Sequence, residues 1–195
     1  MNDNADHLVI EKVLAGDLQA YGELVERYQD FVFTNCLRIL KSREEAEEVA
    51  QDSFLKAFHS LKSFRGDSKF STWLYRIAYH KSLDKLKKLN REQHFQVVEE
   101  ITESDSAGLE NGLDCLLREE RMALVEEAVK SLPEIDAAII NYYYFEELPV
   151  KEIATITALS EDNIKIRLYR GRKQLFSYLK QYINPEISRN NGKAI

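Results

Sequence analysis

Long hydrophobic runs, cysteine pairs and metal-binding motifs are what this 195-residue chain lacks. No apolar run approaches the roughly 18–20 residues that a membrane-spanning helix requires. The N-terminal stretch MNDNADHLVIEKV is acidic and has no basic segment followed by an apolar one, so we expect no secretory signal. The only cysteines, Cys36 and Cys115, form no CxxC pair. We therefore expect a cytoplasmic protein with reduced thiols, no metal site and no insertion into a membrane.

Motifs typical of enzymes are missing as well. The sequence has no Gly-rich phosphate loop, no HExxH zinc motif and no carboxylate pair that stands apart from ordinary surface charge. We therefore expect neither catalysis nor a cofactor. What the chain does have is 44% hydrophobic and 31% charged residues with only 7 Gly and 3 Pro, a composition that indicates a helix-rich globular fold.

The net charge of −6 hides a strong segregation of charge along the chain. Residues 62–91 contain nine basic side chains and two acidic ones, and residues 163–180 contain six basic side chains and no acidic one. Residues 92–120 reverse this balance, with nine carboxylates against Arg118 alone. Two basic segments in an acidic protein indicate local sites for an anionic partner such as nucleic acid.

The hydrophobic pattern predicts an all-α fold with two small helical domains. The first domain is expected at residues 8–90 and the second at 118–183, joined by an acidic flexible linker at 91–117 and followed by a frayed tail at 184–195. In the first domain we expect Gly16 to end a helix begun at residue 8, and Asp17 and Ser42 to cap the next two helices. A polar loop at 63–71 then precedes a helix over about 72–89.

The second domain contains a short helix, a tight turn and a longer helix in the stretch LPVKEIATITALSEDNIKIRLYRGRKQL. This pattern is typical of a helix-turn-helix, in which the second helix enters the major groove of DNA. Lys and Arg there bind phosphates or guanine, Asn pairs with adenine, and Asp accepts from cytosine. The candidate DNA-binding residues are Ser160, Asp162, Asn163, Lys165, Ile166, Arg167, Arg170 and Lys173. An ordinary helical hairpin with a solvated basic face is the alternative, and Ala158 and Thr157 favour it because such turns usually have Gly and an apolar residue there.

Two stretches together resemble bacterial ECF (extracytoplasmic-function) RNA polymerase sigma factors of the sigma-70 family. SREEAEEVAQDSFLKAFHSLKSFRGDSKFSTWLYRIAYHKSLDKL is similar to the family's N-terminal region 2, and LPEIDAAIINYYYFEELPVKEIATITALSEDNIKIRLYRGRKQL to its C-terminal region 4. The matches stand in the family's order and cover most of the chain. The resemblance implies a transcription initiation factor that binds core RNA polymerase, through the beta-prime clamp helices and the beta subunit, and promoter DNA in double-stranded and melted form.

The resemblance assigns the helix after Ser42 to docking on the clamp helices. Its polar face is acidic, which fits a basic partner surface and would steer association. A solvated helix face without a partner is the alternative. The implied core-polymerase-binding residues are Glu44, Glu47, Glu48, Gln51, Asp52 and Lys56.

The resemblance also implies that the loop before STWLYRIA holds flipped bases of the promoter's minus-ten element. A flipped base requires a π-face and nearby hydrogen-bond donors, and the loop has both residue types. The implied minus-ten residues are Phe64, Arg65, Gly66, Asp67, Ser68, Lys69, Phe70, Trp73, Arg76, His80, Lys81, Lys85 and Lys88. Trp73 lies at core spacing and is as compatible with the core as with DNA, and the aromatic run 142–145 is expected to pack the second domain.

Two positions depart from the family's pattern. His80 stands where the family usually has Asn, and Ile166 stands in place of a small polar residue on the recognition helix. The family's promoter preferences therefore do not transfer to this chain, and His80 introduces a pH dependence near neutrality.

Two further expectations come from the family alone. An anti-sigma factor is expected as a partner, and the acidic linker either threads the polymerase cleft or is a plain tether. The alternatives to a sigma factor are a sigma-like mimic that sequesters an anti-sigma factor without binding DNA, and a helix-turn-helix regulator that binds DNA alone. A mimic has no need of the basic residues on the loop and recognition helix, and a lone regulator leaves the first domain unexplained.

Overall fold

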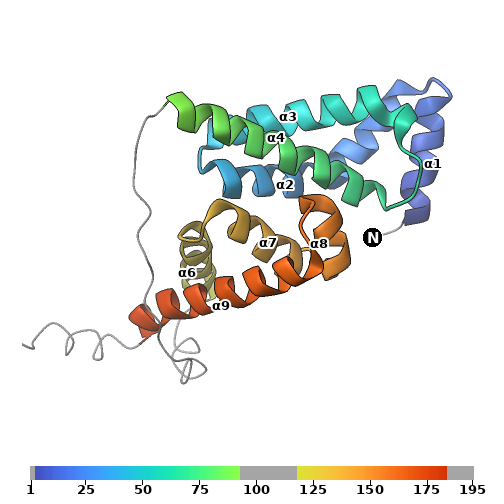
Figure 1. Cartoon of the computed structure of the whole chain (residues 1–195). Helices are drawn as coiled ribbons and strands as arrows, with labels where there is room; N and C mark the ends of the chain where they lie inside the picture. The colour runs from blue at the N-terminus through green and yellow to red at the C-terminus, as the bar shows by residue number, and fades with distance from the viewer. Residues whose placement is uncertain (1–2, 93–117, 184–195) are drawn as a thin grey trace, which may run out of the picture.

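The computed structural model describes residues 3–92 and 118–183, which form helices and no strand (Figure 1). The expected all-α class is confirmed for these residues. The helices fall into two groups along the chain. The first group contains α1 (Asp3–Leu14), η1 (Leu18–Ala20), α2 (Tyr21–Leu40), α3 (Arg43–Ser60), η2 (Leu61–Ser63) and α4 (Phe70–Glu92). The second contains α6 (Arg118–Lys130), α7 (Glu134–Tyr144), α8 (Val150–Thr157) and α9 (Glu161–Ile183). The expected linker at 91–117 and tail at 184–195 lie almost wholly outside the described residues.

Local capping chemistry sets most helix starts. The Asp17 carboxylate accepts from the backbone N–H groups of Gln19 and Ala20, and the Ser42 hydroxyl accepts from the Glu45 N–H. Both expected caps are confirmed. Pro133 and Pro149 occupy the N-cap positions of α7 and α8, where the missing N–H is not needed for the helix.

Two helix starts in the first group differ from expectation for tertiary reasons. α1 begins at Asp3 rather than at residue 8, and its buried Asp6 receives hydrogen bonds from the Tyr28 hydroxyl and the Arg27 guanidinium of α2. α4 begins at Phe70 rather than at Thr72, and the Phe70 side chain is only 1% exposed. Phe70 is therefore part of the core rather than of the polar loop.

The first group is built around α2, α3 and α4, which all contact one another. Their apolar stripes supply the core, with Leu24, Val32 and Ile39 from α2, Ala57 from α3 and Leu74 from α4 completely buried. This packing leaves the opposite face of α3 free for polar residues.

The second group packs α8 and α7 against the long helix α9. Ile153 of α8 and Ile164 and Leu168 of α9 are buried between the two helices of the predicted helix-turn-helix. Gly171 of α9 lies so close to Ile140 of α7 that an added Cβ would approach the Ile140 side chain to 3.1 Å. The core therefore fixes which face of α9 remains outside.

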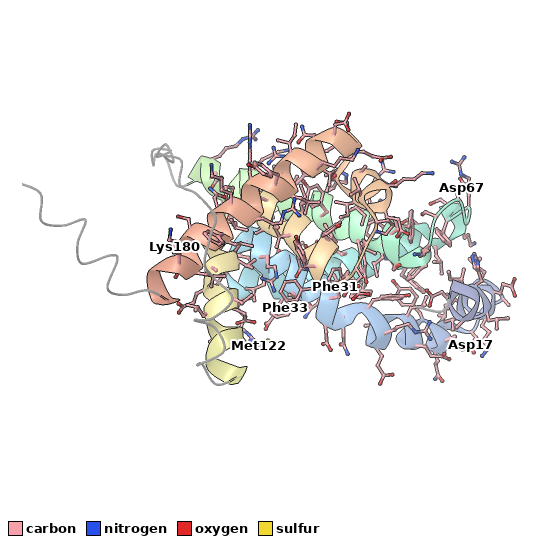
Figure 2. The ribbon with its side chains drawn as sticks, turned by 90° about the horizontal axis from the view of Figure 1, so that it is seen from below. Asp17, Phe31, Phe33, Asp67, Met122 and Lys180 are labelled. Carbon is pink, nitrogen blue, oxygen red and sulfur yellow. The ribbon has the colours of Figure 1, made fainter. Side chains whose placement is uncertain are left out.

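The two groups pack on each other along α2 and α4, with α7 against α2 and α8 against the start of α4 (Figure 1). Phe31, near the middle of the molecule in Figure 2, contacts Tyr142 of α7 and Tyr75 of α4. Tyr142 is fully buried, whereas Tyr143, Tyr144 and Phe145 are exposed. The prediction that the whole run 142–145 packs the second domain is therefore wrong for three of its four rings, and Tyr142 joins the two groups.

Candidate nucleic-acid and partner interfaces

The acidic face of α3 is exposed along its whole length. The six predicted docking residues, Glu44, Glu47, Glu48, Gln51, Asp52 and Lys56, all have exposed side chains. Leu55 lies among them and is 56% exposed, a large apolar side chain that the sequence reasoning missed. Its position three residues after Asp52 and one before Lys56, on the polar side of the helix, is the signal that could have found it. The face therefore combines carboxylates with one exposed apolar side chain near its C-terminal end.

The loop between η2 and α4 presents charge above an aromatic cluster. Phe64 is half-buried and contacts Phe70 and Trp73 at ring-centroid distances of 5.8 and 5.3 Å. The side chains of Arg65 and Asp67 are well exposed and pair at 3.0 Å. Gly66 between them has a φ of +75°, a left-handed conformation that favours glycine. Trp73 is half-buried and packs against the core on its Phe70 side.

Helix α1 covers part of this loop. The His7 ring stacks on Phe64 at 6.1 Å, and an added Cβ at Gly66 would lie 3.4 Å from the His7 ring. The loop is thus supported from both sides, by α1 and by the first turn of α4. These contacts restrict the backbone of the loop at Phe64 and Gly66.

The basic residues of α4 differ in exposure and in pairing with α3. Arg76 and Lys88 are exposed. Lys81 pairs with Asp52 at 2.9 Å, and Lys85 contacts Glu48 at 2.7 Å and also Glu45 of α3. Hydrogen bonds to these two carboxylates raise the pKa of Lys85. The two paired lysines therefore neutralise part of the α3 face and are held at the boundary between the α3 and α4 surfaces.

His80 lies half-buried on α4. Burial, followed by the neighbouring charge of Arg76, lowers the pKa of its imidazole, while Asp84 acts in the opposite direction. A lowered pKa keeps this side chain neutral at pH 7 and above, so it can both donate and accept a hydrogen bond there.

The helix-turn-helix has the expected geometry with two unusual residues in its turn. Ala158 adopts the left-handed conformation, with φ of +59°, that Gly normally supplies. The buried Thr157 hydroxyl donates to the Ile153 carbonyl at 2.8 Å and accepts from the Leu159 N–H at 3.4 Å. Ser160 caps α9 through the Asn163 N–H at 3.3 Å. Thr157 thus satisfies its own polar group at a position where an apolar residue was expected.

The outward face of α9 carries most, but not all, of the predicted minus-thirty-five residues. Asp162, Lys165 and Arg170 are exposed, Lys173 is half-buried, and Ile166 is 51% exposed. Tyr169 is 63% exposed on the same face, and the sequence reasoning missed it although it lies three residues after Ile166. The helix therefore presents two apolar side chains among its cations.

Arg167 is held inside the second group instead of projecting freely. Its guanidinium donates to the Asp136 carboxylate of α7 at 2.6 Å and to the Asn163 side-chain oxygen at 2.9 Å. The Asp136 side chain is nearly buried. Asn163 and Arg167 thus orient each other, and Arg167 must break or share these bonds to bind a base.

Neither a membrane span nor a metal centre is found in the parts of the chain that the structure describes. No helix there is long and apolar enough to cross a membrane. Within residues 3–92 and 118–183, no three His, Cys, Asp or Glu side chains gather as metal ligands.

Comparison with known proteins identifies the family. The model of sigma-70 region 2 matches residues 24–92, and that of sigma-70 region 4 matches residues 122–175. The RNA polymerase sigma-H factor of Pseudomonas aeruginosa is 32% identical over 90% of this chain and 94% of its own length. The ECF RNA polymerase sigma factor SigW of Bacillus subtilis is 30% identical over 88% of this chain and 95% of its own.

A solved structure agrees in fold. The sigma factor RpoE of Bartonella quintana, crystallised with the anti-sigma factor NepR, superposes with a TM-score of 0.63 at 19% identity over 82% of this chain and 96% of that one. Both regions, in the family's order and over nearly the full length of the relatives, are therefore present. The chain belongs to the sigma-70 family and is an ECF RNA polymerase sigma factor.

Proposed function

We propose that this sigma factor binds core RNA polymerase through α3 and reads promoter DNA through the loop 63–71, α4 and α9. One observation carries the assignment: the exposed faces of these elements are sorted by charge, with carboxylates on α3 and cations on α4 and α9. An acidic face suits a protein partner with a basic surface, whereas the basic faces suit phosphates.

Docking on the beta-prime clamp helices uses the acidic face of α3. Its carboxylates steer the encounter, and Leu55 provides an apolar contact near the C-terminal end of the face. Lys85 and Lys81 hold Glu48 and Asp52 in fixed positions, which lowers the entropy lost on docking. The beta subunit is the second expected contact on core polymerase.

Capture of minus-ten bases takes place at the loop between η2 and α4. Unstacking a base costs a few kcal/mol, and stacking on an aromatic side chain returns roughly 1–3 kcal/mol per base. Phe64 offers the accessible edge of the aromatic cluster, and Arg65, Asp67 and Lys69 offer exposed polar groups around it. Melting is then nearly balanced and requires no ATP. Arg76 and Lys88 hold the phosphates of the adjoining strand.

Recognition of the minus-thirty-five element uses the N-terminal half of α9. The exposed cations Lys165 and Arg170 bind phosphates or guanine, and Ile166 and Tyr169 can contact thymine methyl groups. The chain then acts as two DNA-binding domains, residues 8–90 and 118–183, connected by the acidic segment 91–117. An anti-sigma factor controls it in the cytoplasm, in line with the complex in which the B. quintana relative was crystallised.

The direct test is transcription from a promoter library. Purified chain and core RNA polymerase are incubated with randomised promoter-like DNA, and the 5′ ends of the transcripts are sequenced. We expect initiation well above core polymerase alone, with enriched bases near minus ten and minus thirty-five. The variant Arg76→Ala with Lys88→Ala serves as a control that keeps α3 intact and should bind core but initiate poorly.

Each other result points elsewhere. Core binding without initiation from any sequence would favour a mimic that sequesters an anti-sigma factor. Absence of core binding would contradict the assignment of α3 and leave a regulator that binds DNA alone.

A further inference from the structure

A carboxylate from the second helical group binds to the start of α4. We call the arrangement in which the two groups pack on each other the closed chain. Glu152 of α8 accepts from the Lys69 ammonium at 2.8 Å through one oxygen and from the Thr72 hydroxyl at 2.9 Å through the other. Thr72 is buried, and the Glu152 side chain is only 22% exposed. These residues are 80 or more positions apart in the sequence, so only the packing of α8 on α4 brings them together.

The two donors converge on one anion. An ammonium and a hydroxyl that each bind a different oxygen of the same carboxylate present the geometry that a phosphate with two free oxygens also satisfies. Lys69 belongs to the loop that faces DNA in the proposed function, and Thr72 follows it by one turn. A carboxylate and a DNA phosphate cannot occupy this position together.

A second carboxylate supports the same closure. Glu146, just after α7, accepts from the Tyr75 hydroxyl of α4 at 3.3 Å, and burial raises the pKa of Glu146. On α2, the Arg38 guanidinium lies over the Phe145 ring at 5.0 Å, and Lys41 pairs with Glu134 at 3.2 Å. The closed contact thus runs along both α2 and α4.

The contact is also imperfect, which suits a contact that opens. Tyr142 Oη and Arg38 Nε are buried between the groups and have no hydrogen-bond partner within the described residues. A buried polar atom without a partner costs free energy that hydration on opening recovers. A permanent core of this size would ordinarily satisfy such atoms.

Promoter binding requires the groups to separate. The minus-ten and minus-thirty-five elements are about 25 base pairs apart, or roughly 85 Å along the duplex at 3.4 Å per base pair. In the closed chain, α8 contacts both α4 and α9, so the two DNA-binding surfaces belong to one small body.

We propose that Lys69 and Thr72 form a binding site for a promoter phosphate, and that Glu152 occupies this site in the closed chain and so competes with DNA. The inference rests on the proposed function, because it takes the start of α4 to face DNA. Opening then exposes the site and releases the second group toward its own promoter element in a single step.

The test measures binding of a fluorescein-labelled single-stranded 20-mer of mixed sequence to the full chain at low salt. Glu152→Gln keeps the shape of the side chain but removes the competing charge, and we expect about three- to tenfold tighter binding. Glu147→Gln is the matched control, since it removes the same charge from an exposed position on the same segment. We expect less than a twofold change for the control.

The same pair of variants is then measured with Lys69→Gln and Thr72→Val already in place. The gain from Glu152→Gln should disappear in this background, because the site that Glu152 blocks no longer exists. A gain that survives there, or equal gains from Glu152→Gln and Glu147→Gln, would overturn the proposal and leave only a net-charge effect.

Small-angle X-ray scattering without DNA measures the closed contact by itself. We expect a larger radius of gyration for Glu152→Gln than for Glu147→Gln. If the radius increases while DNA affinity does not respond to Lys69→Gln and Thr72→Val, the phosphate site is wrong although the closed contact is real. If Arg76→Ala with Lys88→Ala also leaves DNA affinity unchanged, the proposed DNA-facing role of α4 fails with it.

Discussion

The outward face of α3 and the start of α4 differ in how far the chain itself occupies them. The α3 face is exposed, and its ion pairs come from α3 itself or from the adjacent α4. At the start of α4, by contrast, Lys69, Thr72 and Tyr75 bind carboxylates of the second helical group. The surface proposed to dock on core polymerase is therefore exposed in the closed chain, whereas the start of α4, part of the proposed DNA-binding surface, is occupied by the second group.

This difference suggests an order of events. In the proposed function, core polymerase docks on α3 while the chain is closed, because the α3 face is already exposed. Any contact that polymerase makes preferentially with the open chain then shifts the equilibrium between closed and open chain toward the open one. Under the proposed competition between Glu152 and a promoter phosphate, DNA binding before docking is disfavoured because the groups remain together.

The largest expected effect comes from the aromatic contact between the groups. Tyr142→Ala should lower the free energy of unfolding by about 3–5 kcal/mol, because a completely buried ring between Phe31 and Tyr75 is lost. Tyr143→Ala should cost less than about 1 kcal/mol, since Tyr143 is exposed. Urea denaturation of the two variants measures the difference.

Tyr142→Phe sharpens this test. The hydroxyl has no partner within the described residues, so its removal should leave stability unchanged or raise it slightly. A loss of more than about 1 kcal/mol for Tyr142→Phe would show that the hydroxyl has a hydrogen-bond partner after all. Equal losses for the two alanine variants would show that Tyr142 is not the residue that joins the groups.

The next effect concerns the open face of α3. Glu44→Lys with Glu47→Lys should weaken binding to core polymerase by roughly 10- to 100-fold, since two carboxylates that face a basic surface become cations. The control, Glu23→Lys with Glu26→Lys, makes the same charge change on exposed positions of α2. Binding is measured with labelled chain and purified core at two salt concentrations. Equal weakening by both variants would assign the effect to net charge.

A smaller effect distinguishes Asp136 of α7 from Asp162 of α9, each of which pairs with a cation of α9. Asp136→Asn should cost about 1–2 kcal/mol of stability, because nearly buried Asp136 forms a charge-assisted hydrogen bond with Arg167. Asp162→Asn should cost less than about 0.5 kcal/mol, because its pair with Lys165 is exposed. Thermal unfolding compares them. A larger loss for Asp162→Asn would contradict the buried placement of the Arg167 pair.

What the sequence could predict here is local. Capping residues and the helical period depend on neighbours within four positions, so Ser42 and Asp17 marked helix starts correctly. The same reasoning placed the packed pair of helices α8 and α9. It failed by two residues at Phe70, where burial against Tyr28 extends α4 backward into a segment with loop composition.

Contacts between distant segments could not be predicted from patterns. Glu152 and Lys69 lie 83 positions apart, and nothing in either neighbourhood marks the other. Tyr142 belongs to a run of four aromatic residues, and only the packing of α7 on α2 decides which ring is buried. The sequence therefore predicted the charged faces of the candidate site. It did not predict that Glu152 binds at the start of α4.

The smallest expected effect concerns His80 on α4. Because burial and Arg76 lower the pKa of its imidazole, the folded chain holds His80 neutral at pH 7.5 and binds a proton less readily than the unfolded chain. Its contribution to stability is therefore present above the unfolded pKa of about 6.5 and is lost as the pH falls below it. In urea denaturation, the wild type should lose more stability than His80→Asn between pH 7.5 and 5.5. His59→Asn, at an exposed position near the end of α3, should behave like the wild type.

Once protonated, His80 also adds a positive charge to α4, so affinity for the 20-mer should rise by no more than about threefold over the same range. If stability and affinity for the 20-mer depend on pH in the same way in His80→Asn and the wild type, protonation of this imidazole influences neither folding nor DNA binding.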